Sequence, residues 1–154
     1  MIRRSSLLLF TLGILLGAGA LFGHRVYTRH ALAARYIPAV PALSDRPAAL
    51  AESLAEAEAR SRDWLKSTRG LAELSRLYHA NGFYPEAMTC YDGLRLLEPA
   101  NARWPHLQAS IITNFGRMDE ALPLRQQAVE LAPDYIPARL RLGDVLLKGN
   151  RPAD

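Results

Sequence analysis

Hydrophobic and polar positions along the chain follow two different patterns. Residues 5–23 contain no charged side chain and are rich in leucine. At about 1.5 Å per residue, a helix of this length matches the ~30 Å hydrocarbon core of a bilayer. We therefore expect a transmembrane signal-anchor at residues 5–23, behind a short basic N-terminus at residues 1–4. From residue 48 onward, apolar side chains instead recur every three or four positions, which predicts amphipathic helices.

The apolar N-terminal segment has two possible fates. Small residues from Ala18 to Ala20 provide a possible cleavage site, and cleavage of a signal peptide would give an exported soluble protein. Apolar residues continue through Phe22, however, and Arg25 flanks the far side, so we favour a retained anchor. The prediction is a bacterial-type, single-pass protein of the inner (cytoplasmic) membrane, with the rest of the chain on the periplasmic or extracytoplasmic side. The lipid bilayer would then be a partner through residues 5–23, and the glycines there leave self-association open.

Residues 24–47 and 48–66 connect this segment to the rest of the chain. Prolines in residues 24–47 fix the backbone torsion φ, so this juxtamembrane and Pro-rich linker is expected to be semi-rigid. Ser44 or Asp45 could cap the helix that follows, with Pro47 in its first turn. An apolar stripe from Leu50 to Trp64 makes residues 48–66 an entering amphipathic helix that covers the next unit.

A repeat with a period of 34 residues dominates the remainder. Gly82 matches Gly116, Ala87 matches Ala121, and Pro99 matches Pro133. Gly82 and Gly116 would end a first helix in a left-handed conformation, the two alanines and Gly143 would allow two helices to cross closely, and the prolines would stop the second helix. The predicted packing positions are Leu74, Tyr78, Gly82, Ala87, Tyr91 and Pro99 in residues 68–101, Ala109, Gly116, Ala121, Ala128 and Pro133 in residues 102–135, and Leu142, Gly143 and Leu146 in residues 136–154.

These residues resemble the tetratricopeptide repeat (TPR) family, in its N-terminally membrane-anchored type. The resemblance implies an all-α fold, a solenoid of antiparallel helix pairs preceded by an N-terminal transmembrane or signal helix. Residues 68–101 are then the first repeat, residues 102–135 the second, and residues 136–154 an incomplete third with only its first helix. The sequence departs from the family pattern at Pro105 and Gln108, where large apolar residues are usual, and at Arg125, where an aromatic residue is usual.

In this family the first helix of each unit lines a groove that receives a peptide. The corresponding residues are Arg69, Arg76, His79, Arg103, His106, Asn114, Asp144 and Lys148. This strip is polar and mildly basic, so an acidic peptide segment or a free carboxyl terminus is the expected ligand. Ala72 and Arg76 stand where the carboxylate-clamp subfamily has lysine and asparagine, so binding of chaperone tails is not predicted.

Charge and reactive residues narrow the function further. Five arginines from Arg3 to Arg35 supply all the excess positive charge, and the later residues carry −1 together, which leaves the net charge of +4; no nucleic-acid partner is therefore expected. The single Cys90 and four scattered histidines give neither a disulfide nor a zinc spacing. No nucleotide-binding or hydrolase motif is present, so we predict no catalytic residue, no metal, no cofactor and no enzyme.

Together these features predict a membrane-anchored scaffold or assembly factor that binds a protein segment. The third repeat stops after its first helix, and an array needs its ends covered. The alternative is therefore the N-terminal fragment of a longer repeat-containing protein whose catalytic or cofactor domain lies downstream.

Overall fold

The computed structural model describes the backbone of residues 4–148 and the side chains of residues 13–147. Residues 1–3 of the predicted basic N-terminus and residues 149–154 of the predicted third repeat lie outside the described residues. Residues 4–148 form seven helices and no strand: α1 (Arg4–Ala34), α2 (Ala48–Arg62), α3 (Ser67–Ala80), α4 (Tyr84–Leu97), α5 (Arg103–Asn114), α6 (Met118–Leu131) and α7 (Ile136–Lys148). This all-α architecture fits a helical repeat solenoid.

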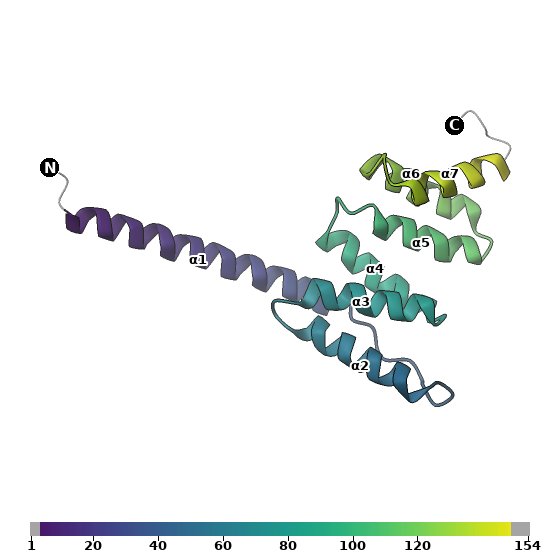
Figure 1. Ribbon diagram of the computed structural model, residues 1–154, viewed down its shortest axis with the longest axis horizontal. Helices are drawn as coiled ribbons and strands as arrows, with labels where there is room; N and C mark the ends of the chain where they lie inside the picture. Colours follow the sequence, from purple (N-terminus) through teal and green to yellow (C-terminus); the bar gives the residue numbers. More distant parts are fainter. Residues whose placement is uncertain (1–3, 149–154) are drawn as a thin grey trace.

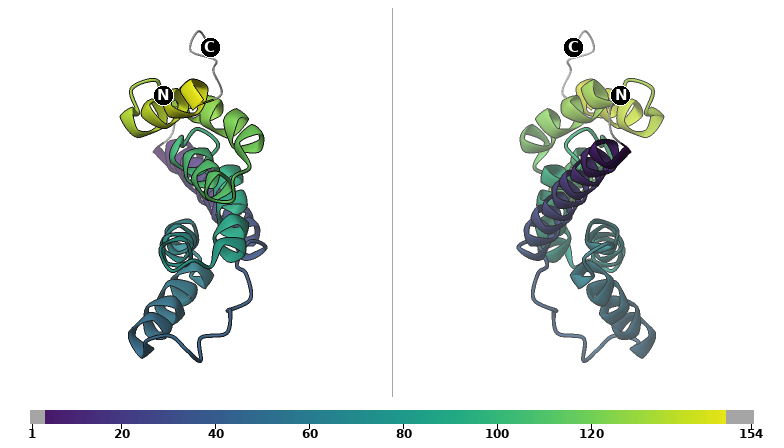
Figure 2. Two further views of the ribbon diagram at one scale, coloured as in Figure 1. Left: turned by 90° about the vertical axis from the view of Figure 1, so that its right-hand side faces the viewer. Right: turned by 90° about the vertical axis from the view of Figure 1, so that its left-hand side faces the viewer.

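The helices from α2 to α7 stack in the order of the sequence, and α1 extends away from the stack as a long arm (Figure 1). Only the last turns of α1 pack on α2, α3 and α4. The linker between α1 and α2 forms an open loop at one edge of the stack (Figure 2). Tyr36, just after α1, lies against Gly93 of α4, where a Cβ would come within 2.5 Å of the Tyr36 Cβ. Gly93 therefore allows the end of the arm to dock closely.

Two tight turns pair α3 with α4 and α5 with α6. Gly82 and Gly116 have φ of 81° and 74°, a region that side chains with a Cβ rarely adopt. After each glycine the chain reverses, and the amide of Phe83 donates to the Tyr78 carbonyl at 2.9 Å. This bond satisfies one of the carbonyls left free at the end of α3.

The hydrophobic core lies between the first helix pair, α2 and the end of α1. Leu71, Leu74 and Tyr78 of α3 and Tyr91 and Leu94 of α4 are all buried. Leu54 and Ala57 of α2 and Ala33 of α1 belong to the same cluster. Each fully buried leucine contributes about 1.5–3 kcal/mol. Packing against α3 thus stabilises α2, whose apolar face is narrow.

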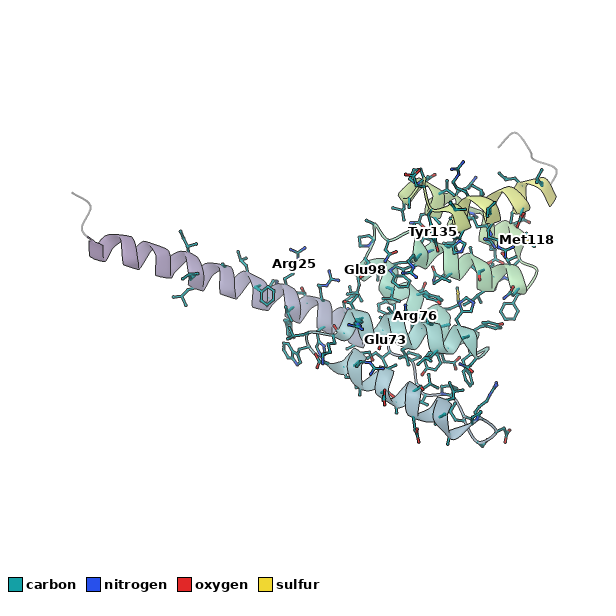
Figure 3. The ribbon with its side chains drawn as sticks, in the orientation of Figure 1. Arg25, Glu73, Arg76, Glu98, Met118 and Tyr135 are labelled. Atoms are coloured by element: carbon teal, nitrogen blue, oxygen red, sulfur yellow. The ribbon has the colours of Figure 1, made fainter. Side chains whose placement is uncertain are left out.

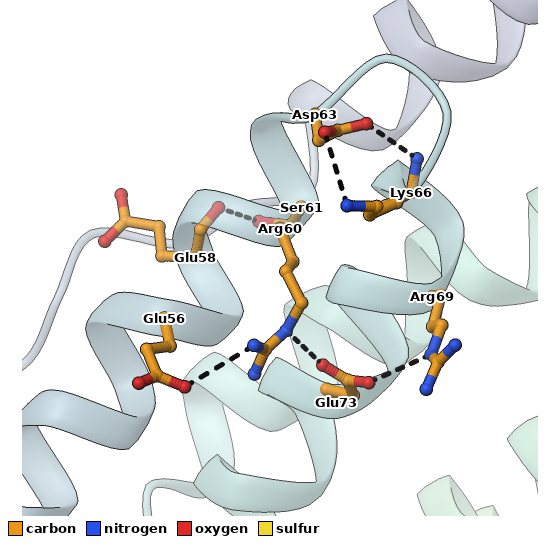
Figure 4. Close-up of polar contacts among 8 residues, drawn as sticks. All are labelled: Glu56, Glu58, Arg60, Ser61, Asp63, Lys66, Arg69 and Glu73. Atoms are coloured by element: carbon orange, nitrogen blue, oxygen red, sulfur yellow. Dashed lines mark hydrogen bonds and ion pairs between the residues drawn. The ribbon is translucent and has the colours of Figure 1, made fainter.

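Polar contacts also join α2 to α3 (Figure 4). Arg60 of α2 donates from Nε to Glu73 Oε2 of α3 at 2.6 Å, and Arg69 donates to Glu73 Oε1 at 3.2 Å. Burial alone would raise the pKa of Glu73, but the hydrogen bonds from the two arginines outweigh it and lower the pKa below its ordinary value. Glu73 therefore accepts hydrogen bonds from both helices.

The ends of α2 differ from the sequence expectation. Pro47 precedes the helix as its N-cap, with ψ of 140°, and neither Ser44 nor Asp45 caps it through a side chain. The helix also ends at Arg62, because the Asp63 carboxylate accepts bonds from the amides of Leu65 and Lys66 and turns the chain. Figure 4 shows the contact of Asp63 with Lys66. Trp64 consequently lies beyond α2 and stacks on His30 of α1, with ring centroids 5.0 Å apart.

The structure corrects the predicted membrane location. Within residues 13–147, whose side chains are described, no helix combines the length and apolar character needed to cross a membrane. In this part of α1, glycine or alanine fills many positions from Gly13 to Gly23, and Arg25 and Arg29 follow. The expected single-pass anchor of the inner membrane is therefore wrong. Residues 5–12 of the predicted span are helical in backbone, but their side chains lie outside the described residues.

Candidate peptide-binding surface

The predicted groove residues lie on α3, α5 and α7, the first helices of the predicted repeats. Arg69, Arg76 and His79 belong to α3, Arg103, His106 and Asn114 to α5, and Asp144 and Lys148 to α7. Figure 3 shows Arg76 near Glu73 on α3, far from Arg25 on the extended arm. Lys148 is the last residue of α7, and its side chain is not among those described.

On α3 the three predicted residues have different environments. Arg69 is exposed but is already bound to Glu73. Arg76 is exposed and forms no ion pair with a carboxylate of residues 13–147. His79 is half-buried, and its Nδ1 lies 3.0 Å from the Tyr91 hydroxyl. The free cation on this helix is therefore Arg76, within the part of the chain that the structure describes.

Burial keeps the pair formed by His79 and Tyr91 neutral. It lowers the pKa of His79, and it raises the pKa of Tyr91 to about 12. Tyr84 also packs edge-on against the His79 ring, with centroids 6.0 Å apart. His79 thus contributes an aromatic wall between α3 and α4 and no positive charge near neutral pH.

The start of α5 lies beside a broad groove of about 890 Å³. Arg103 lines it together with Arg29 of α1 and Tyr135, which precedes α7. His106, one turn further along α5, packs edge-on against Tyr135 at 5.3 Å. Burial, then the charges of Arg125 and Arg141, lower the pKa of His106.

The end of α5 and the middle of α7 meet at a smaller pocket of about 200 Å³. This pocket brings together two predicted residues, Asn114 and Asp144, and Ser110 and Thr113 also line it. Asp144 pairs with Arg141 at 3.3 Å, and both side chains are exposed. The remaining lining residues are Met118, Arg125, Arg141 and Val145, with Met118 at the start of α6 (Figure 3).

Arg125 of α6 is a residue of this pocket that sequence reasoning did not select. It is only 3% exposed. Its Nη2 donates to Thr113 Oγ1 at 2.8 Å, and Thr113 in turn donates to the Ala109 carbonyl at 2.7 Å. The signal that could have found it is its departure from the family pattern, which puts an aromatic residue at this position.

Gln108, the other polar departure, joins three helices. It is 1% exposed and donates to Asp92 Oδ1 of α4 at 2.6 Å. Arg95 of α4 donates to Gln108 Oε1 at 3.0 Å and to Gln127 Oε1 of α6 at 2.9 Å. Both the amide nitrogen and the oxygen of this buried glutamine are therefore paired, and the network fixes α4, α5 and α6 together.

The packing positions predicted from the repeat occupy mixed environments. Leu74, Tyr78, Ala87, Tyr91, Ala109, Ala121, Ala128 and Leu146 are buried, whereas Leu142 and Gly143 are half-buried and Pro99 and Pro133 are exposed in turns. A Cβ at Gly143 would meet no atom within 4 Å. The space around Gly143 therefore does not require glycine, in contrast to the expected close crossing.

Reactive groups in the described region lie in unreactive surroundings. Cys90 is fully buried, and burial, with a smaller effect of Glu86, raises the pKa of its thiol to about 12. Within residues 13–147 no three His, Cys, Asp or Glu side chains converge as metal ligands. A thiol held in the protonated form is a poor nucleophile.

No family model matches this chain. Among curated proteins, it is similar to the "Inactive TPR repeat-containing thioredoxin TTL3" of Arabidopsis thaliana, with 32% identity over 79 residues. The matched part is 49% of this chain and only 11% of that relative. This distant similarity and the paired helices fit a TPR-like family.

Proposed function

We propose that this chain is a protein-interaction module that binds a segment of another protein across α3, α5 and α7, and so acts as a scaffold or assembly factor. The distant relative is a TPR-containing protein described as inactive, which supports an interaction role over a catalytic one. The segment is acidic, because exposed arginines lie on this surface. The observation that carries the proposal is that Arg76 and Arg103 are exposed and form no ion pair within residues 13–147.

The second helices support this assignment of the binding surface. Ala87 in α4 and Ala121 and Ala128 in α6 are fully buried, so α4 and α6 hold the array together. The first helices keep polar side chains exposed, as Arg76 and Arg103 do. Polar side chains at a groove orient a peptide and give specificity, and arginine also steers an acidic partner by long-range attraction.

Binding of defined peptides tests the proposal. A library of acidic 12-residue peptides and matching Asp→Asn, Glu→Gln peptides is screened against the full chain by fluorescence anisotropy. We expect acidic members to bind, and Arg76→Glu with Arg103→Glu to weaken binding by about tenfold or more, most strongly at low salt.

The matched control is Arg62→Glu with Arg117→Glu, which makes the same charge change at exposed positions at the end of α2 and the start of α6. These two arginines already pair with Glu58 and Glu120. Equal losses in both double variants would mean that only net charge matters, and would reject α3, α5 and α7 as the binding surface.

A further inference from the structure

Arg125 has unusual surroundings for a buried arginine. It lines the pocket of about 200 Å³ between α5, α6 and α7 and is 3% exposed. Thr113 accepts a bond from its Nη2, but its Nε and Nη1 are buried without a partner among residues 13–147. A buried positive charge is costly unless a carboxylate or several acceptors compensate it, and arginine does not lose its proton to escape that cost. Within the described part of the chain, therefore, nothing accepts a hydrogen bond from these two nitrogens of a residue that lines the pocket.

We propose that this pocket is a carboxylate-binding site, in which the Arg125 guanidinium receives one carboxylate of the bound segment. The proposal rests on the proposed function for the source of that carboxylate. A guanidinium donates two charge-assisted hydrogen bonds to one planar carboxylate from adjacent nitrogens, which here means the second hydrogen of Nη2 together with either Nε or Nη1. Ser110 and Asn114 of α5 also line the pocket and add a hydroxyl and an amide that can contact the ligand.

Charge around the pocket selects a single negative group. Arg141 and Asp144 neutralise each other at 3.3 Å, and His106, the other titratable neighbour, is uncharged near neutral pH because burial and the two arginines lower its pKa. The remaining charge is that of Arg125. A pocket of about 200 Å³ is smaller than most small-molecule sites, which span roughly 300–1,000 Å³. It suits one acidic side chain or one chain terminus.

Asp144 modulates this site without occupying it. Its carboxylate lines the pocket but bonds to Arg141, and it forms no ion pair with Arg125. A negative charge here repels an entering carboxylate and attracts Arg141 away from it. Neutralising Asp144 should therefore strengthen binding, an effect opposite to that of most pocket substitutions.

Three short peptides probe the site in the full chain labelled with ¹⁵N-arginine. Acetyl-Gly-Ser-Gly carries only a terminal carboxylate, acetyl-Gly-Asp-Gly-amide carries only a side-chain carboxylate, and acetyl-Gly-Ser-Gly-amide carries neither. We expect the Arg125 Nε–H signal to shift saturably with one or both of the first two and not with the third. The peptide that shifts the signal identifies the source of the carboxylate. No shift with either carboxylate peptide would overturn the proposal.

Variants give a second readout. Arg125→Met and Arg125→Lys should weaken binding of the effective peptide by about tenfold or more, because paired donors are lost. Asp144→Asn should tighten it, and Arg117→Met, at an exposed arginine outside the pocket, should leave it unchanged. Unchanged affinity in a folded Arg125→Met variant would overturn the site. If the long acidic peptides still bind in that case, the proposed function stands without this site.

Discussion

Gly70 of α3 lies directly against the backbone of Ser61 in α2. A Cβ at position 70 would fall 2.2 Å from the Ser61 amide nitrogen and 2.6 Å from its Cα. Both atoms are backbone, so no side chain could rotate away to make room. Ser61 is itself fully buried, and its hydroxyl donates to the Glu58 carbonyl at 2.7 Å. The approach of α2 to α3 therefore depends on glycine at this position.

Gly70→Ala should consequently destabilise the fold. Overpacking of this kind costs about 1–3 kcal/mol, and the gain of roughly 1 kcal/mol in helix propensity offsets only part of it. The control is Gly143→Ala in α7, where a Cβ meets nothing within 4 Å, and we expect that change to stabilise the protein. Urea unfolding of the two variants measures both effects. Equal stability of Gly70→Ala and the wild type would contradict the close contact.

Substitutions at the turn glycine Gly82 should destabilise the fold for a different reason. Its φ is 81°, and a Cβ at this position would meet no atom within 4 Å, so the cost of a substitution comes from the backbone conformation and not from crowding by neighbours. Gly82→Ala should lower the free energy of unfolding by about 1–2 kcal/mol, and Gly82→Asn by less, because asparagine tolerates the left-handed region. Thermal unfolding followed by circular dichroism distinguishes the two. If both variants cost the same, the left-handed conformation is not the cause.

Helices and turns could be predicted because they depend on residues close together in the sequence. Contacts between distant residues could not be predicted. A left-handed turn needs glycine within a few residues, so Gly82 could be recognised from its place between two apolar patterns. The contact of Gly70 with Ser61 depends on how α2 docks, and nothing in the spacing of either helix encodes it. Helix α2 could be predicted, but its end could not, because Asp63 turns the chain before Trp64.

For the candidate surface, too, the sequence predicted positions along the helices but not the contacts between them. Placing Asn114 and Asp144 on successive first helices was possible from the repeat period, and the structure brings them to one pocket. Sequence analysis did not select Arg125 as a residue of this pocket, since periodicity alone makes it a core position. Its departure from the family pattern was the only sign that a charge would be buried there. The membrane prediction was wrong because it relied on the length and leucine content of residues 5–23, whereas the described part of α1 is rich in glycine and alanine and continues to Arg25 and Arg29.

Acidification should weaken the fold through His79 and His106. Burial lowers the pKa of both side chains, so the folded state favours their neutral forms. In the unfolded chain they bind protons near the ordinary pKa of 6.5. The contribution of the two neutral side chains to the free energy of unfolding is therefore complete above about pH 6.5. It is lost as the pH falls toward their lowered pKa values in the folded state. Urea unfolding at about pH 7.5, above the ordinary pKa of histidine, and at about pH 5.2, below it, measures the loss, and His79→Gln with His106→Gln should flatten the dependence. An unchanged slope in that double variant would assign the pH effect to other groups.

Cys90 should resist alkylation in the folded protein. The thiol is fully buried, and burial raises its pKa to about 12, so almost no thiolate forms at about pH 8. We expect iodoacetamide to react only as fast as the protein opens, and to modify Cys90 rapidly in guanidinium chloride. Mass spectrometry over time measures both rates. Fast modification under native conditions would show that α4 separates from its neighbours far more often than this packing implies.

Arg125 should reduce stability in the absence of a ligand. Its Nε and Nη1 are buried without a partner within residues 13–147, and its pKa is lowered, first by burial and then by Arg141. Replacing a buried, incompletely paired charge by an apolar side chain of similar length is often neutral or stabilising by about 1–4 kcal/mol. Arg125→Met should therefore raise the midpoint of thermal unfolding, although it also removes the bond to Thr113. Arg125→Gln, which keeps a polar group in the same place, is the comparison and should gain less. A strong loss of stability in Arg125→Met would show that the guanidinium is compensated in the free protein, and that the pocket has no need of an external carboxylate.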